Sequence, residues 1–215
     1  MTTNTLTNEV SLRQFLGLKS GNGTKPAKPS AAGTLTRVSD RFPDCVLQNH
    51  RGEKRRFRTD LVRDQRVLIS FIYTRCEGIC PRTMAGLREA YEQLKREKTG
   101  EFRMLSITVD PKRDTVSDLM DYSVDNWVSD LPNWELLVGS EADTLAIRQA
   151  LGAAEKDPEK RDDLKSHSGL VIFGNDRTNR WNAIPAGVAP THIAHAFQRI
   201  TREGSFSDLI KLNRQ

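Results

Sequence analysis

The sequence has few cysteines, few aromatic residues and no long apolar segment. Three cysteines in 215 residues are too few for the disulfide framework that stabilises small secreted domains. No segment approaches the ~18 apolar residues that span a bilayer. The N-terminal apolar cluster Phe15–Leu18 is too short for a secretion signal. These absences predict no transmembrane segment and, for the chain as written, a cytoplasmic location.

Basic residues outnumber acidic ones, giving a net charge of +5 and a pI of about 9.2. Such a charge can favour nucleic acid or an anionic membrane. Here the two signs are mixed along the chain, and no nucleic-acid motif is present. The densest basic run, at 54–58, alternates as the solvent face of a strand does. We therefore expect no nucleic-acid partner.

The chain divides into a polar tail and one folded domain. Residues 1–33 are rich in Thr, Asn, Ser, Gly, Lys and Pro and cannot bury enough apolar surface to order themselves. We expect them to form a flexible tail or linker, and residues 34–215 to form a single domain. The charged stretch Glu155–Lys165 predicts a mobile insertion within that domain.

Hydrophobic periodicity predicts alternating strands and helices. A continuous apolar run at 67–73 is typical of a strand buried on both faces, and Pro81 suits the first turn of a helix. Asp114 or Thr115, and then Ser140, suit helix N-caps. The predicted strands are 42–47, 55–58, 67–73, 102–109, 134–138, 169–173 and 181–184, and the predicted helices begin near residues 81, 115, 140 and 190. This order predicts an α/β, thioredoxin-like fold with an N-terminal β-hairpin and a C-terminal β-hairpin plus helix.

The strongest chemical signal is the segment CEGICP at 76–81, between the buried strand and the helix that follows it. A thiol at a helix N-terminus has its thiolate stabilised by unpaired amides and the helix dipole. Cys76 and Cys80 are four positions apart, close enough for a disulfide or one shared metal ion. The alternative is that both cysteines only pack in the core.

His167 is a candidate third participant, because it directly precedes the predicted strand at 169–173. A lone histidine is more often a surface residue, but a thioredoxin-like chain brings the start of that hairpin beside the thiol turn. Two thiolates select Cu(I), zinc or iron–sulfur chemistry. Because structural zinc usually takes four protein ligands, a three-ligand site favours copper.

Three segments resemble the Sco/SenC family of thioredoxin-like copper metallochaperones, which help to build the copper centre of cytochrome c oxidase. The matching segments are FIYTRCEGICP (71–81), VDPKRDT (109–115) and His167-Ser168, within roughly 42–200. The resemblance implies that Cys76, Cys80 and His167 bind one copper ion, as Cu(I) and possibly Cu(II). It also implies an oxidase copper subunit or another copper acceptor as partner, and a thiol reductant.

The resemblance places Asp110 and Asp114 near the metal as supporting residues, and it also marks two departures. Members usually have Pro and Asp after the first cysteine, where this chain has Glu77 and Gly78. Members are usually periplasmic or membrane-anchored, whereas no anchor is visible here.

Two other functions remain open from the sequence. One is a thiol–disulfide oxidoreductase or thiol peroxidase that uses the same cysteine pair. The other is a redox or copper sensor. Cys45 is expected to be a small core residue, His50 to lie in a turn, and His192 and His195 to lie on an exposed helix face.

Overall fold

A computed structural model of the chain describes residues 37–154, 157 and 169–202. The predicted tail at 1–33, nearly all of the predicted insertion at 155–165, and His167 lie outside these residues. Among the described helices, none is both long and apolar enough to cross a bilayer.

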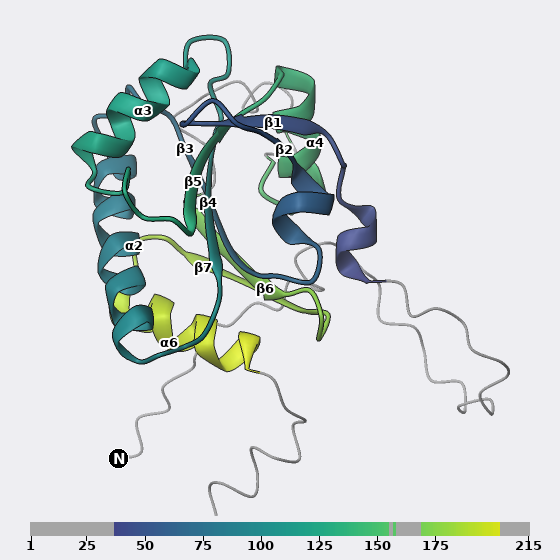
Figure 1. Cartoon of the computed structure of the whole chain (residues 1–215), viewed down its shortest axis with the longest axis vertical. Coiled ribbons are helices and arrows are strands. Elements are labelled where there is room, and N and C mark those ends of the chain that lie inside the picture. Colours follow the sequence, from purple (N-terminus) through teal and green to yellow (C-terminus); the bar gives the residue numbers. More distant parts are fainter. Residues whose placement is uncertain (1–36, 155–156, 158–168, 203–215) are drawn as a thin grey trace, which may run out of the picture.

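The described residues form a seven-stranded mixed sheet with helices on both faces, as the sequence predicts (Figure 1). The strand order is β2-β1-β5-β4-β3-β6-β7. The strands are β1 (Val46–Asn49), β2 (Lys54–Arg56), β3 (Arg66–Ile72), β4 (Arg103–Thr108), β5 (Trp134–Val138), β6 (Leu170–Asn175) and β7 (Arg180–Pro185). The central strands β3, β4 and β5 are parallel, and the flanking pairs are antiparallel. The ends of β3 and β4 therefore meet at one edge of the sheet.

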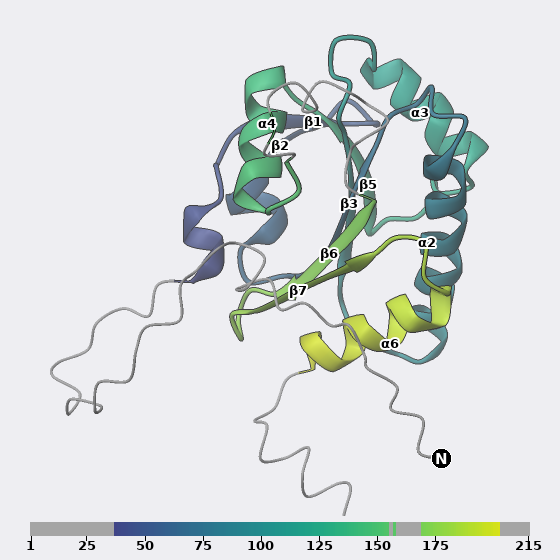
Figure 2. The same cartoon turned by 180° about the vertical axis from the view of Figure 1, so that it is seen from behind.

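Three helices cover one face, and a fourth helix with two short helical turns covers the other (Figures 1 and 2). The first set is α2 (Ile79–Arg96), α3 (Val116–Asp125) and α6 (Pro190–Thr201). The second is α4 (Glu141–Ala150), the 3₁₀ turn η1 (Val38–Arg41) and the π-helical turn η2 (Phe57–Val62). The predicted N-caps Thr115 and Ser140 each accept a hydrogen bond from the backbone N–H three residues on.

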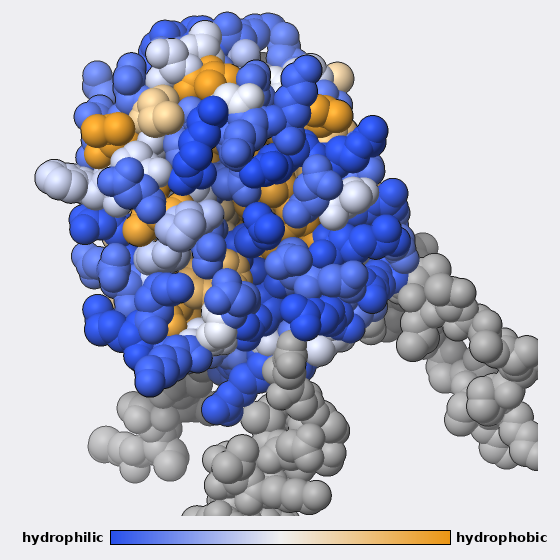
Figure 3. All heavy atoms as spheres, in the orientation of Figure 1, coloured by the Kyte–Doolittle hydropathy of each residue, from blue (hydrophilic) through white to orange (hydrophobic). Residues whose placement is uncertain are grey.

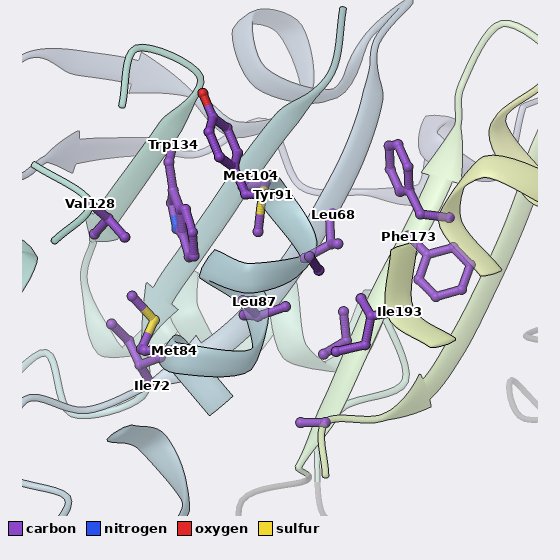
Figure 4. Close-up of a cluster of buried hydrophobic side chains, with 14 of the residues drawn as sticks. Leu68, Ile72, Met84, Leu87, Tyr91, Met104, Val128, Trp134, Phe173 and Ile193 are labelled. Atoms are coloured by element: carbon purple, nitrogen blue, oxygen red, sulfur yellow. The ribbon is translucent and has the colours of Figure 1, made fainter. Parts of the chain in front are cut away.

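The central strand β3 shows why its sequence is nearly all apolar. Leu68 and Ile72 pack into the core beneath α2, α3 and α6, whereas Val67 and Ile69 pack into the core on the opposite face. Figure 4 shows the first of these cores, with side chains of α2 facing the sheet. Both faces of β3 are therefore removed from water.

The predicted N-terminal hairpin is shorter than expected at both ends. Phe42 does not begin a strand: it follows η1 and packs its ring edge against Trp181, with centroids 5.1 Å apart. At the other end β2 stops at Arg56, because the fully buried Phe57 begins η2 instead. In both places burial of an aromatic ring outweighs the strand pattern.

Candidate metal and redox site

Cys76 lies in the turn that joins β3 to α2, and Cys80 lies in the first turn of α2, at the edge where the parallel strands end. β3 ends at Ile72, and α2 begins at Ile79, two residues earlier than the predicted start at Pro81. The Cys76 side chain is 7% exposed and that of Cys80 is 1% exposed. Both thiols belong to the core beneath α2 and α3. The sequence therefore correctly located the turn, but not its depth of burial.

Cys76 is the more acidic thiol of the pair. Burial opposes its ionisation, but hydrogen bonds outweigh this effect and lower the pKa of Cys76 below 9.0. The hydrogen bonds come from the backbone of Cys80, the side chains of Tyr73 and Cys80, and the backbone of Gly78. Gly78 is the N-cap of α2 and places no side chain over the helix end. The open helix N-terminus thus stabilises a thiolate at Cys76.

Cys80 has the opposite tendency. Burial is the largest cause; a backbone hydrogen bond at Tyr73 opposes it, but the interactions with Cys76 and the charge of Asp114 add to it, and the pKa of Cys80 rises to about 12. The pair therefore combines one thiol that ionises more easily than an ordinary cysteine with a neighbour that ionises less easily. This asymmetry suits a two-step exchange in which one sulfur attacks and the other completes the reaction.

The carboxylate of Asp114 fastens the cysteine turn to the end of β4. It accepts hydrogen bonds from the Thr74 backbone N–H at 3.1 Å and the Thr74 hydroxyl at 2.6 Å. The Thr108 hydroxyl donates a third, at 2.5 Å. Asp114 is 1% exposed. The structure therefore brings this predicted supporting residue to the base of the thiol turn.

Asp110 lies at the same edge, but its carboxylate contacts an arginine and not the thiol turn. Its carboxylate pairs with Arg113 Nε at 2.6 Å, and its backbone N–H donates to Thr108 Oγ1 at 3.0 Å. Among the described residues, no group of three His, Cys, Asp or Glu side chains is arranged to hold a metal ion. The described part of the site therefore offers the two thiols as soft ligands.

β6 begins at the cysteine edge. It runs antiparallel to β3 with Ser70 opposite Val171, so its first residues lie beside the end of β3. A Cβ atom built on Gly169 would lie 3.0 Å from Ile79 Cδ1, in the first turn of α2. The chain therefore enters β6 in contact with the helix that carries Cys80.

Sequence reasoning missed Tyr122 of α3. Its side chain is buried in the core that contains both thiols, and its hydroxyl has no hydrogen-bond partner among the described residues. Burial, then the charges of Cys80, Cys76 and Asp114, raise the pKa of Tyr122. The apolar spacing of α3 could have marked this position as inward-facing, but not its closeness to the thiols.

Four residues that the sequence set aside lie away from the thiol turn. Cys45 is half-buried against the opposite core, and burial raises its pKa to about 11. His192 and His195 are exposed on α6, as predicted. His50 is in a turn but is fully buried, and its Nδ1 accepts a hydrogen bond from the Leu136 N–H at 3.2 Å.

Comparison with known proteins assigns the family. Residues 37–202 match the SCO1/SenC family. This chain belongs to that family. An SCO1 protein homolog of Bacillus subtilis is 32% identical over 112 residues, which cover 51% of this chain and 56% of the relative. The chain thus spans about half the length of this curated relative.

Solved structures of family members share the fold. An SCO1/SenC family lipoprotein from Bacillus anthracis superimposes with a TM-score of 0.63 at 18% identity, covering 75% of this chain and 95% of that protein. ScoI of Arabidopsis thaliana, solved with copper bound, gives a TM-score of 0.57 at 18% identity, covering 72% of this chain and 93% of that protein. The predicted thioredoxin-like fold is therefore confirmed.

Proposed function

We propose that this protein binds Cu(I) through Cys76, Cys80 and His167 and passes it to an acceptor during assembly of the cytochrome c oxidase copper centre. The observation that carries the proposal is the thiol pair, buried at the open N-terminus of α2 with one thiol acidified by hydrogen bonds. Thiolate sulfur is a soft donor that prefers Cu(I). The family membership and the copper-bound relative support the same choice of metal.

Copper is the cargo in this proposal, and the surrounding residues prepare its ligands. The amides at the start of α2 favour the thiolate form of Cys76. Burial of both sulfurs limits the approach of water and of unrelated thiols. The negative charge of Asp114 disfavours a free thiolate at Cys80 but attracts a cation. Metal binding is therefore coupled to loss of the Cys80 proton.

The proposed third ligand is supported by the path of the described chain. Gly169 contacts the first turn of α2, and His167 is two residues before it in the sequence. Two residues span at most about 7 Å. His167 is therefore close enough to the cysteine edge along the chain to serve as the proposed third ligand.

The redox state of the pair controls loading in this proposal. Oxidation joins the two Sγ atoms and releases two protons and two electrons to an oxidised thiol partner, so no thiolate remains to bind copper. Reduction by a partner dithiol restores both ligands. The same turn can therefore be loaded only when it is reduced.

An anaerobic Cu(I) titration of the fully reduced chain tests the proposal, with a chelator of known affinity as competitor. We expect one tightly bound ion, weakened at least about tenfold in His167→Ala. His195→Ala is the matched control, because His195 is an exposed histidine on α6, and we expect its affinity to be unchanged. Equal affinities in the two variants would exclude His167 as a ligand.

A second candidate function is thiol–disulfide exchange, which the unequal pKa values of the pair favour. The Cys76 thiolate would attack a substrate disulfide and form a mixed disulfide. Cys80 would then displace the substrate dithiol, leaving a Cys76–Cys80 disulfide. Cys80→Ser should trap the mixed disulfide, and the reduced protein should reduce insulin. Insulin reduction without Cu(I) binding would favour this function over the first.

A further inference from the structure

The C-terminal end of α3 presents an acidic surface around an exposed aromatic side chain. We define the α3-end surface by its exposed residues, which are Asp121, Val124, Asp125, Trp127 and Asp130. Trp127 is 73% exposed and Val124 is 54% exposed. Figure 1 places α3 at the upper left of the molecule, and Figure 3 shows apolar patches scattered among hydrophilic ones over the same region. Tryptophan is among the residues most enriched at interaction hot spots.

The charge of this surface is unusual for the chain. From Asp114 to Glu135 there is no lysine, arginine or histidine, although the whole chain carries +5. Within the described residues, no ion pair neutralises Asp121, Asp125 or Asp130. Nucleic acids and anionic membranes are therefore repelled here, and a cationic protein segment is attracted.

The same residues are unfavourable choices for the local structure that they form. Asp121 and Asp125 are like charges at positions i and i+4 of α3. Asp125 ends the helix and Asp121 lies one turn before it; the last turn contains no basic residue, so the two carboxylates oppose the helix dipole. Trp127 has a φ of +58° because it forms the C-terminal cap of α3, where the Trp127 N–H donates to the Val124 carbonyl and the Val128 N–H donates to the Ser123 carbonyl; this position usually carries glycine rather than a bulky residue. Such costs concentrated on one surface point to a use other than stability.

The surface opens into a groove of about 520 Å³ between three elements. Asp125 and Trp127 line one side, Ala85 of α2 lies along the wall, and Pro190 at the start of α6 lines the end. The α2 wall carries both arginines and glutamates, so the excess negative charge comes from α3. The groove gives an extended segment room to place an apolar side chain beside Trp127.

We propose that the α3-end surface docks a partner protein through a segment that presents arginine or lysine beside an apolar side chain. Cations of the partner would contact Asp121 and Asp125, and one of them can lie against the ring of Trp127. The inference does not depend on which reaction the thiols perform.

The test uses the full chain and a fluorescent synthetic peptide that alternates arginine with leucine, with a glutamate–leucine peptide as its counterpart. We expect the basic peptide to bind, and binding to weaken about tenfold in Asp121→Asn/Asp125→Asn and in Trp127→Asn. The matched control is Val46→Ser/Glu101→Gln, which removes an exposed apolar side chain and a carboxylate that belong neither to the α3-end surface nor to its groove. We expect this control to bind as the unchanged protein does.

Stability separates docking from a structural role. The double Asp variant should raise the midpoint of thermal unfolding by about 2 °C, because it relieves like-charge repulsion and the conflict with the dipole. A variant that is more stable yet binds more weakly cannot have lost binding through misfolding. Loss of both stability and binding would assign these residues a structural role and overturn the proposal.

Fluorescence identifies the occupant of the surface. Of the three tryptophans, Trp134 and Trp181 are buried, so acrylamide quenching reports mainly on Trp127. Protection of Trp127 by the basic peptide but not by the acidic peptide supports the proposal. Equal binding of the two peptides overturns it. Protection of Trp127 from acrylamide in the absence of any peptide also overturns the proposal. If this protection is lost when residues 1–36 are deleted, the chain's own segment occupies the surface. If it is lost on dilution, a second copy of the chain occupies it.

Discussion

Two buried aspartates lie at opposite edges of the sheet, and the protein satisfies them differently. Asp176 follows β6 and accepts hydrogen bonds from Arg37 Nη1 at 2.8 Å, the Asp64 N–H at 2.9 Å and the Ser39 hydroxyl. Asp114, at the cysteine edge, accepts from two threonine hydroxyls and one backbone N–H of the described residues. Among the described residues, a cation thus pairs with Asp176, whereas the donors to Asp114 are all uncharged.

The comparison distinguishes Asp176, which stabilises the fold, from Asp114, which also changes the pKa of a thiol. The Asp176 ion pair joins the first described residue, Arg37, to the end of β6. The hydroxyl donors of Asp114 fix its position without cancelling its charge, and that charge contributes to the raised pKa of Cys80. Removing each carboxylate should therefore have different consequences at the thiols.

The largest effect is expected at the structural edge. Asp176→Asn should lower the free energy of unfolding by about 3 kcal/mol, because three donors lose an ionised, buried acceptor. Urea denaturation measures this change, and the rate of thiol alkylation should stay the same. Asp64→Asn is the control: Asp64 is the exposed second partner of Arg37, and its loss should cost under about 1 kcal/mol. Equal losses in the two variants would contradict the role assigned to Asp176.

At the cysteine edge, Asp114→Asn should cost about 2 kcal/mol through weaker hydrogen bonds to Thr74 and Thr108. It should also lower the pKa of Cys80, because the nearby negative charge is gone. The measurement is the pH dependence of iodoacetamide alkylation at Cys80, followed by mass spectrometry with Cys45 as internal reference. An unchanged Cys80 profile in a folded variant would show that Asp114 acts only as a structural residue.

Sequence patterns predicted the cysteine edge better than the cluster around Asp176. The cysteine edge follows from a continuous apolar strand, a proline-marked helix and a motif between them, all of which are local. The Asp176 cluster joins residues far apart in sequence, such as Arg37 and Asp176, which no local pattern connects. His50 and Tyr122 show the same limit, because their burial depends on how distant elements pack. Family resemblance named Asp114, but its hydrogen bonds required the structure.

His50 is a buried titratable group away from the thiols, and its effect should be confined to stability. Burial is the main cause that lowers the pKa of His50 below its ordinary value of 6.5. The unfolded chain then takes up a proton before the folded protein does. Stability is complete above about pH 6.5 and falls as the pH drops below that value, by at most about 1.4 kcal/mol per pH unit for one proton.

Denaturant unfolding between about pH 7 and pH 5 checks this expectation. His50→Gln should flatten the pH dependence, whereas the exposed His195→Gln should leave it unchanged. A slope that survives His50→Gln would assign the titration to another group.

The smallest effect is expected from removal of the Tyr122 hydroxyl. The informative result is whether the free energy of unfolding rises or falls. Tyr122→Phe should raise the free energy of unfolding by about 1 kcal/mol, because it removes a buried polar group for which the described part of the chain supplies no hydrogen-bond partner. Tyr91→Phe is the matched control in the same core, since the Tyr91 hydroxyl is not among the described buried groups that lack a partner. Its change should stay within about 0.5 kcal/mol.

A loss of stability in Tyr122→Phe would mean that the hydroxyl already donates to a neighbour at the thiol turn. The cysteine edge would then be as fully satisfied as the Asp176 cluster, and the contrast between the two edges would rest on charge alone. A gain in stability would show that the thiol edge retains an unmet hydrogen-bond donor, which the fold keeps despite its cost.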